Sequence, residues 1–186
     1  MKPFKKEKFP VTNIRKFLEP GPIVLVSSAR KGEKNIMTMG WYMVLWEDPS
    51  LVACMIWDQD YSHQLIKKSK ECVINIPTTA IAEKVVQIGN CSGRDVDKFK
   101  EFELTPMKGK IVGAPLIKEC FANFECRLVD SSQIKKYNLF IFEVVSAQVA
   151  QTPKFPKTIH YRGDGEFMIS GPTVSKYRKL FKPEFL

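Results

Sequence analysis

The sequence predicts a mostly antiparallel, closed β-barrel decorated with a few short helices. Apolar runs of strand length recur along the 186 residues, bounded by glycine, proline and polar turn residues. Only three or four segments show the spacing of a short helix, and no internal repeat or low-complexity tract is visible. Many strands combined with few, short helices are typical of a closed all-β fold.

The strands are predicted from apolar runs and the turn residues between them. Residues 51–57 (LVACMIW) are nearly continuous in apolar side chains, which indicates burial on both faces. A polar turn at 31–34 separates the first two strands and predicts a hairpin. We expect strands at residues 23–29, 36–46, 51–57, 72–76, 117–129 and 137–149.

The helices are predicted from short stretches with apolar residues at helical spacing. Ile81, Val85 and Ile88 recur at this spacing, and Ser62 is a candidate N-cap for the preceding helix. We expect helices at 64–70, 80–88 and 173–181, and helical turns near 14–18 and after the polar loop at 89–99. Residues 105–115 are predicted to be irregular, and a turn is predicted at 160–165.

Length and composition favour one folded domain over residues 1–186. With 44% hydrophobic and 26% charged residues, the chain can bury its own core and is neither disordered nor fibrous. We expect an N-terminal arm at 1–19 and a C-terminal extension at 151–186. No apolar run reaches the ~18 residues of a membrane span. The lysine-rich start lacks the apolar part of a signal peptide, so no membrane contact and a cytoplasmic location are predicted.

The charge and the cysteines narrow the classes of function. The formal charge of +9 comes from lysines and arginines spread along the chain, without a helix-turn-helix, zinc-finger or RNP-like pattern. We therefore predict no nucleic-acid partner, and the charge fits a solvated surface or a small anionic ligand. The five cysteines form no CxxC pair, and potential metal ligands are scattered, so no metal site is predicted. Cys91, in a polar loop, is the one candidate reactive thiol.

One stretch, residues 35–46, has an unusual composition for a core strand. NIMTMGWYMVLW crowds three methionines and two tryptophans around one asparagine and one threonine. Thioethers and indole rings suit a flat aromatic ligand, and Asn35 and Thr38 could hydrogen-bond its polar rim. Ordinary core packing explains the same composition, so the stretch alone leaves both interpretations open.

The common catalytic arrangements are missing from the sequence. Only His63 and His160 could serve a nucleophile, and neither accompanies a GxSxG pattern. No GxGxxG or GxxxxGK[ST] motif is present to cradle a nucleotide. Either a bound cofactor brings its own chemistry, or the protein is not an enzyme, and we assign no side chain as an acid or base.

Several motifs, taken in order, resemble the flavin reductase-like, flavoredoxin-type FMN-binding split barrels. They are PGP at 20–22, NIMT at 35–38 with Trp41, DPSLV at 48–52, SH at 62–63, CVINIP at 72–77, SGRDVDKF at 92–99 and FEC at 124–126. The similarity spans roughly residues 18–150, and its specificity lies in the combination. It implies a six-stranded antiparallel split barrel, usually a homodimer, with one FMN per subunit at or near the interface.

The resemblance also implies where FMN lies. Asn35 and Trp41 would lie against the isoalloxazine ring, with Ser62 close by, and Lys98 would reach the flavin edge. Phe167 would close the pocket, whereas Tyr137 replaces a histidine of several relatives, which leaves a proton-donor role open. The predicted cofactor-binding residues are Asn35, Met37, Thr38, Trp41, Trp57, Ser62, His63, Lys98, Tyr137 and Phe167.

Three functions are compatible with these observations. The leading hypothesis is an FMN-dependent oxidoreductase that takes a hydride from NADH or NADPH and passes electrons to a second flavin, a metal chelate or a protein. A flavoredoxin-like carrier would instead receive electrons from a redox-protein partner. A basic nucleic-acid-binding module without a cofactor is the third, and the spread of the lysines along the chain disfavours it. Arg94 either pairs with Asp95 or Asp97 or faces a nucleotide phosphate, and the sequence does not separate these roles.

Overall fold

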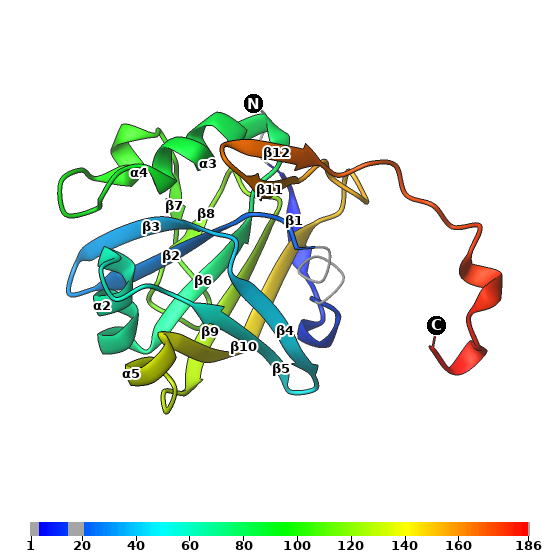
Figure 1. Ribbon diagram of the computed structural model, residues 1–186, viewed down its shortest axis with the longest axis horizontal. Coiled ribbons are helices and arrows are strands. Elements are labelled where there is room, and N and C mark those ends of the chain that lie inside the picture. Colours follow the sequence, from blue (N-terminus) through cyan, green and yellow to red (C-terminus); the bar gives the residue numbers. More distant parts are fainter. Residues whose placement is uncertain (1–3, 15–20, 186) are drawn as a thin grey trace.

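An antiparallel sheet of eight strands forms the body of the computed structural model, which describes residues 4–14 and 21–185 (Figure 1). The strand order is β3-β2-β6-β9-β10-β5-β4, and β1 adds to β10. The strands are β1 (Lys6–Lys8), β2 (Val24–Arg30), β3 (Glu33–Met39), β4 (Tyr42–Glu47), β5 (Ser50–Met55), β6 (Glu71–Ile76), β9 (Ala122–Asp130) and β10 (Leu139–Ala150). The mostly β fold class is confirmed, but the expected count of six strands is too low.

Four further strands and several short helices complete the described chain. The strands form two pairs, β7 (Pro106–Met107) with β8 (Leu116–Ile117) and β11 (Ile159–Gly163) with β12 (Glu166–Ile169). The α-helices are α2 (Tyr61–Ser69), α3 (Ala82–Gly89), α4 (Lys98–Glu101) and α5 (Ile134–Tyr137). The 3-10 turns are η1 (Val11–Asn13), η2 (Thr79–Ile81), η3 (Arg178–Leu180) and η4 (Pro183–Phe185).

The break at Gly40 and Trp41 is the main departure from the predicted strands. The expected strand at 36–46 is divided into β3 and β4, which are the two ends of the sheet order. A Cβ on Gly40 would lie 3.0 Å from Ile23 Cδ1, so the chain turns here against a core side chain. The Trp41 carbonyl accepts from Met55 N at 3.0 Å, which starts the pairing of the next hairpin. The unusual stretch is therefore a crossing between sheet ends and not one strand.

Other predicted elements are confirmed or corrected as follows. The β2–β3 hairpin turns at Lys31 and Gly32, whose φ values of 49° and 87° fit a two-residue turn of primed type. The expected closing helix at 173–181 is wrong, because only the turn η3 forms there. The predicted turn near 14–18 lies almost entirely outside the described residues. Tyr137 ends α5 instead of opening a strand.

Two apolar clusters pack on the sheet and position the helices. The larger one is filled by the fully buried rings of Phe121, Phe124, Phe140 and Phe142. The second joins Leu25 and Ile36 of the sheet to Val85 and Ile88 of α3 and to Phe99 of α4. Because alternate strand residues face opposite sides, β2 and β3 serve both clusters, and α3 and α4 lie over β3.

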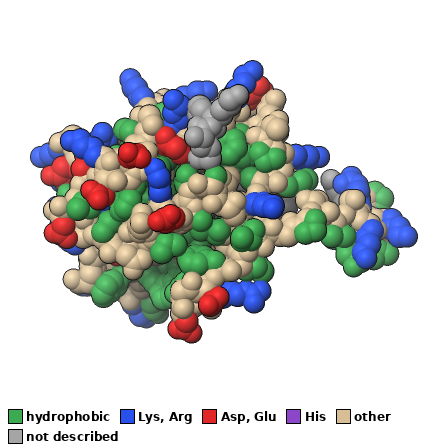
Figure 2. All heavy atoms as spheres, turned by 90° about the horizontal axis from the view of Figure 1, so that it is seen from above, with side chains coloured by type: hydrophobic (Ala, Val, Ile, Leu, Met, Phe, Trp, Pro, Cys, Tyr) green, Lys and Arg blue, Asp and Glu red, His purple; other side chains and the backbone are tan. Residues whose placement is uncertain are grey.

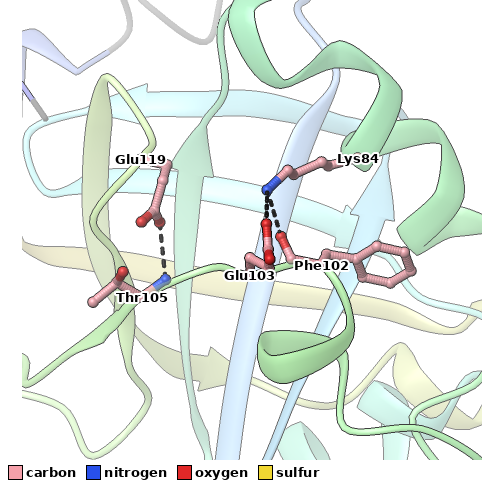
Figure 3. Close-up of polar contacts among 5 residues, drawn as sticks. All are labelled: Lys84, Phe102, Glu103, Thr105 and Glu119. Carbon is pink, nitrogen blue, oxygen red and sulfur yellow. Dashed lines mark hydrogen bonds and ion pairs between the residues drawn. The ribbon is translucent and has the colours of Figure 1, made fainter. Parts of the chain in front are cut away.

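Polar contacts hold the segment that follows α4 in place (Figure 3). Lys84 of α3 donates from Nζ to the Phe102 carbonyl at 2.8 Å and lies 3.8 Å from Glu103 Oε2. Thr105 N donates to Glu119 Oε2 at 3.0 Å. These contacts tie the end of α4 to α3 and to the turn after β8, so they limit how far α4 can move.

Candidate functional site

A groove runs along β3, formed by three adjoining cavities that all include Thr38. The cavities measure about 210, 490 and 580 Å³ and also share residues pairwise. Thr38 is held in place by a hydrogen bond from its Oγ1 to the Val85 carbonyl of α3 at 2.6 Å. The groove is polar where β3 meets α2 and the loop at 90–97, and aromatic where it meets β4 and the β11–β12 hairpin.

Asn35 is the central side chain of the polar cavity. It is 2% exposed, and its Nδ2 donates to Ser62 Oγ at 2.9 Å. Its Oδ1 is buried without a hydrogen-bond partner in the described part of the chain. A Cβ on Gly93 would lie 2.0 Å from this oxygen, so the loop approaches Asn35 as closely as only glycine allows. A buried, unpaired acceptor is costly, and a ligand hydroxyl or N–H at the cavity would satisfy it.

The N-terminus of α2 borders the same cavity. Asp60 is the N-cap residue, so the prediction that Ser62 caps this helix is wrong, and Ser62 lies fully buried in the first turn. Tyr61 and Ser62 line the cavity with the start of the helix. Helix starts carry unpaired N–H groups and a partial positive charge, which favour a bound anion.

Two cationic side chains add to this positive end. Lys98 is 5% exposed, and its Nζ donates to the Ile88 carbonyl at 2.8 Å. Burial lowers the pKa of Lys98, although Cys91 and Asp60 nearby oppose the shift. Arg94 donates to the Gln59 carbonyl at 3.0 Å, and its guanidinium lies 5.3 Å from the centre of the Tyr61 ring. The cavity therefore combines a helix start with two cations, which suits a phosphate.

The aromatic part of the groove offers flat, exposed surfaces. Trp41 is 71% exposed and Trp57 58% exposed, and both line the cavity beside Met37. The third cavity is bounded by Trp41, Phe167 and Tyr161, and the last two rings lie 5.0 Å apart. Exposed indoles beside thioethers provide stacking surfaces for a planar ring.

The β11–β12 hairpin is fixed over this end of the groove by contacts to the start of β2. Ile23 N donates to the Ile159 carbonyl at 2.8 Å, and His160 Nδ1 lies 3.1 Å from the Gly21 carbonyl. The Nε2 of the same histidine lies 3.0 Å from Thr158 Oγ1. His160 is thus a structural residue that aligns the hairpin carrying Phe167.

The structure brings eight of the ten predicted residues to this groove. They are Asn35, Met37, Thr38, Trp41, Trp57, Ser62, Lys98 and Phe167. His63 instead packs against Phe140, with ring centres 5.1 Å apart, and burial lowers its pKa. Consecutive helix residues point about 100° apart, so His63 does not share the face of Ser62. Tyr137 is exposed at the end of α5 and lines none of the three cavities.

The sequence interpretation missed several residues that line the groove. Asp60 lies in both the polar and the adjacent cavity, and burial raises its pKa despite the nearby positive charge of Lys98. Gly93 and Tyr161 also line it. Gly93 lies within the SGRDVDKF motif but was not selected as a site residue, and Tyr161 near a turn carries no recognisable signal, because only the fold brings these residues to β3. Asp60 could have been found as an alternative N-cap.

The described residues hold neither a cluster of metal ligands nor a helix that could span a membrane. Within residues 4–14 and 21–185, no group of three or more His, Cys, Asp or Glu side chains is placed to hold a metal ion. No helix in those same ranges is long and apolar enough to cross a membrane.

The architecture is a split β-barrel of the type found in several solved flavoproteins. One is the FMN-binding domain of a flavin reductases-like enzyme from Shewanella baltica, with a TM-score of 0.87, 22% identity and coverage of 94% of this chain and 99% of that one. Another is flavoredoxin of Desulfovibrio vulgaris, with a TM-score of 0.76, 24% identity and coverage of 84% and 90%. At these identities the likeness establishes the fold.

Sequence comparison establishes the family. Residues 17–166 match the family described as flavin reductase like domain, and this chain belongs to it. An uncharacterized protein of Archaeoglobus fulgidus is 34% identical over 135 residues, covering 73% of this chain and 76% of its own. YddH of Escherichia coli is 31% identical over 175 residues, covering 86% and 92%. The family predicted from the sequence motifs is confirmed.

Proposed function

We propose that this protein binds FMN in the groove along β3 and is an oxidoreductase that moves electrons from NADH or NADPH to an acceptor. The observation that carries the proposal is that the two ends of the groove differ, one being cationic and the other aromatic. A cationic cavity at the start of α2 adjoins, through Thr38, a wider cleft lined by Trp41 and Phe167. FMN has the same division, with a phosphate at one end and a planar ring at the other.

The residues present fit this cofactor. Arg94, Lys98 and the start of α2 suit the phosphate, and the unpaired Oδ1 of Asn35 suits a hydroxyl of the connecting chain. Trp41 and Trp57 offer stacking surfaces for the ring. When bound, FMN supplies hydride and electron transfer, and the protein supplies binding, orientation and local charge. Similar solved structures support the choice, since the Shewanella baltica domain is described as FMN-binding.

The first experiment is flavin content and binding. The purified protein is expected to be yellow, to release FMN on denaturation and to quench the fluorescence of added FMN. A colourless protein that takes up no FMN would contradict the proposal. Mixing the holoprotein anaerobically with NADH and with NADPH then tests the electron donor, because a competent donor bleaches the flavin absorbance.

An electron carrier without its own NAD(P)H activity is the second candidate. The exposure of Trp41 and Trp57 favours it, since the ring end of the groove opens at the surface where a redox protein could approach. The similarity to flavoredoxin of Desulfovibrio vulgaris points the same way. If neither pyridine nucleotide bleaches the flavin but dithionite does, the carrier is the better description.

We also propose a homodimer, as the family resemblance implies. In the described part of the chain, β4 pairs only with β5 and forms one end of the sheet. Its exposed side chains include Met43, Leu45 and Trp46. An unpaired edge with exposed apolar side chains is a ready surface for self-association. Sedimentation velocity over a range of protein concentrations tests this assembly.

A further inference from the structure

The C-terminal segment, residues 171–184, is an exposed arm. Every residue in it is exposed, and the arm leads away from the body beyond β12 (Figure 1). Its hydrogen bonds are local, such as Leu180 N to the Tyr177 carbonyl at 3.0 Å. The last backbone bond to the body before it is Ser170 N to the Thr158 carbonyl at 3.0 Å. Beyond residue 173, no hydrogen bond joins this arm to the body within the described residues.

The composition of the arm does not suit a solvated tail. Four large apolar side chains are exposed along it, namely Val174, Tyr177, Leu180 and Phe181. Segments that stay disordered are poor in aromatic and branched residues, whereas this one has the apolar content of a binding segment. Four cations, Lys176, Arg178, Lys179 and Lys182, accompany a single acid, Glu184. Figure 2 shows the arm protruding from the body with basic and apolar side chains together.

The body offers a surface of matching character at the β4–β5 hairpin. The edge strand β4 exposes Met43, Leu45 and Trp46 and ends at the acid Glu47, and the turn that follows carries the acid Asp48. Backbone groups along an edge can also pair with an extended segment. Apolar residues flanked by acids complement an arm whose apolar residues are flanked by lysines and arginines.

We propose that the arm of each copy packs on the β4–β5 hairpin of a second copy, so that two copies exchange arms. A two-fold dimer makes the exchange reciprocal, because each copy gives one arm and receives one. A specific interface buries about 800 Å² on each partner, and the exposed side chains of one edge strand supply only part of that. The fourteen residues of the arm, 171–184, would add to the area buried on each partner. This inference rests on the proposed homodimer and adds that the exchanged arms complete its interface.

The test compares the full chain with a chain that ends after Thr173. Residues 171–173 are kept because they line a cavity with Ile76 and Phe155 at the root of the arm. Removal of residues 174–186 is expected to raise the dimer dissociation constant by a factor of roughly ten or more, as for loss of central apolar contacts. Sedimentation velocity measures the constant, and thermal unfolding verifies that the shortened chain is folded.

Point variants of the full chain distinguish the contribution of the arm's side chains to dimer affinity from the contribution of its length. Leu180→Ser with Phe181→Ser is expected to weaken the dimer as truncation does, while Ile111→Ser, at an exposed apolar site on another loop, is the control. Asp48→Lys is expected to weaken the dimer, and Lys179→Glu with Lys182→Glu to restore part of the loss. Added salt should weaken the parent dimer, because screening removes a favourable attraction, and should not weaken Asp48→Lys alone, in which like charges face each other.

Cross-linking decides whether the arm packs on its own body or on a partner. A carbodiimide joins lysine to carboxylate in an equal mixture of ¹⁴N-labelled and ¹⁵N-labelled protein. Peptides that join the arm to the 42–55 hairpin should combine both isotopes. Pairs of one isotope only, or an unchanged dissociation constant after truncation, would overturn the exchange while leaving the dimer intact. A full-length chain that is monomeric at every concentration would overturn both, and FMN titration of that monomer still tests the flavin proposal.

Discussion

At the scale of the residue, the site depends on close approaches that no single side chain reveals. Asn35, Ser62, Gly93 and Lys98 come from four segments and meet in one cavity. The Asn35–Ser62 hydrogen bond leaves one buried oxygen without a partner among the described residues. The backbone at Gly93 leaves no room for a side chain beside that oxygen. Two substitutions test this arrangement directly.

Gly93→Ala is expected to weaken FMN binding strongly. The new Cβ would lie 2.0 Å from Asn35 Oδ1, so Asn35 must shift and its bond to Ser62 is strained or lost. We expect roughly a tenfold or larger rise in the FMN dissociation constant, as for the loss of a buried hydrogen bond to a ligand. Gly171→Ala is the matched control, because nothing lies within 4 Å of its Cβ position. Equal FMN affinity in both variants would show that the Asn35 cavity does not hold the cofactor.

Lys98→Met tests which part of FMN the ammonium serves. The sequence resemblance implies the flavin edge, whereas the structure places Lys98 in the cavity at the start of α2. If it serves the phosphate, the variant loses affinity for FMN but not for riboflavin, which lacks the phosphate. Lys100→Met, exposed on the same helix, is the control. Equal losses for both flavins would place Lys98 at the ring instead.

At the scale of the element, a buried carboxylate organises the irregular segment before β8. Glu125 of β9 accepts from the backbone N–H groups of Lys110, Ile111 and Val112 at 3.1, 2.7 and 2.9 Å. Burial alone would raise the pKa of Glu125, but these donors outweigh it, and the pKa is lowered. A segment predicted to be irregular is therefore ordered by one side chain of a strand.

Glu125→Gln is expected to destabilise the protein by about 1–3 kcal/mol, because an amide NH₂ would face a backbone donor. Since folding lowers the pKa of Glu125, its stabilisation is present above the ordinary value of 4.5 and is lost as the pH falls through the lowered value. The variant should thus lose less stability than the parent on acidification. Urea unfolding at several pH values measures both effects, with the exposed Glu101→Gln as control. Parallel pH profiles for all three proteins would refute this role.

At the scale of the whole molecule, the N-terminal segment is tied into the barrel. Strand β1 pairs with the end of β10, and Lys6 reaches across to Asn123 Oδ1 at 2.7 Å. Asn123 in turn donates to Asn75 Oδ1 at 2.7 Å, which links β9 to β6. This network connects the N-terminal segment, the β8 turn and two central strands, so the described barrel closes through polar contacts as well as through its core.

Lys6→Met is expected to make the slope of stability against pH less positive in the alkaline range. Burial lowers the pKa of Lys6 from 10.5 to about 8, against the opposing charges of Cys120 and Glu119. Between these values the unfolded chain holds a proton that the folded protein does not, so Lys6 contributes a rise in the free energy of unfolding with pH. The buried thiols of Cys54, Cys72 and Cys120, whose pKa values burial raises, contribute the opposite slope in all variants, so the Lys6 contribution is measured as the difference between parent and variant. The variant should lack the Lys6 contribution, and the exposed Lys8→Met should keep it. Unfolding by urea from pH 8 to 10.5 measures the slope.

The sequence by itself determined most of the central strands and the family. Alternating and continuous apolar runs predicted β2, β5, β6, β9 and β10, and the motif order predicted the split barrel, because both signals are local in the chain. The stretch at 35–46 was singled out for its composition, and its residues Met37, Thr38 and Trp41 line the groove. Its break at Gly40 was not foreseen, because a strand pattern does not show where the chain must cross between sheet ends.

Only the tertiary structure decided which residues meet. Ser62 and His63 are neighbours in the sequence, yet helix geometry sends one to the groove and the other to Phe140. Gly93 and Asp60 joined the candidate site because loops and helix starts far apart in sequence converge on β3. Local propensities act over a few residues, whereas a site is set by long-range packing, and that packing depends on the whole barrel at once.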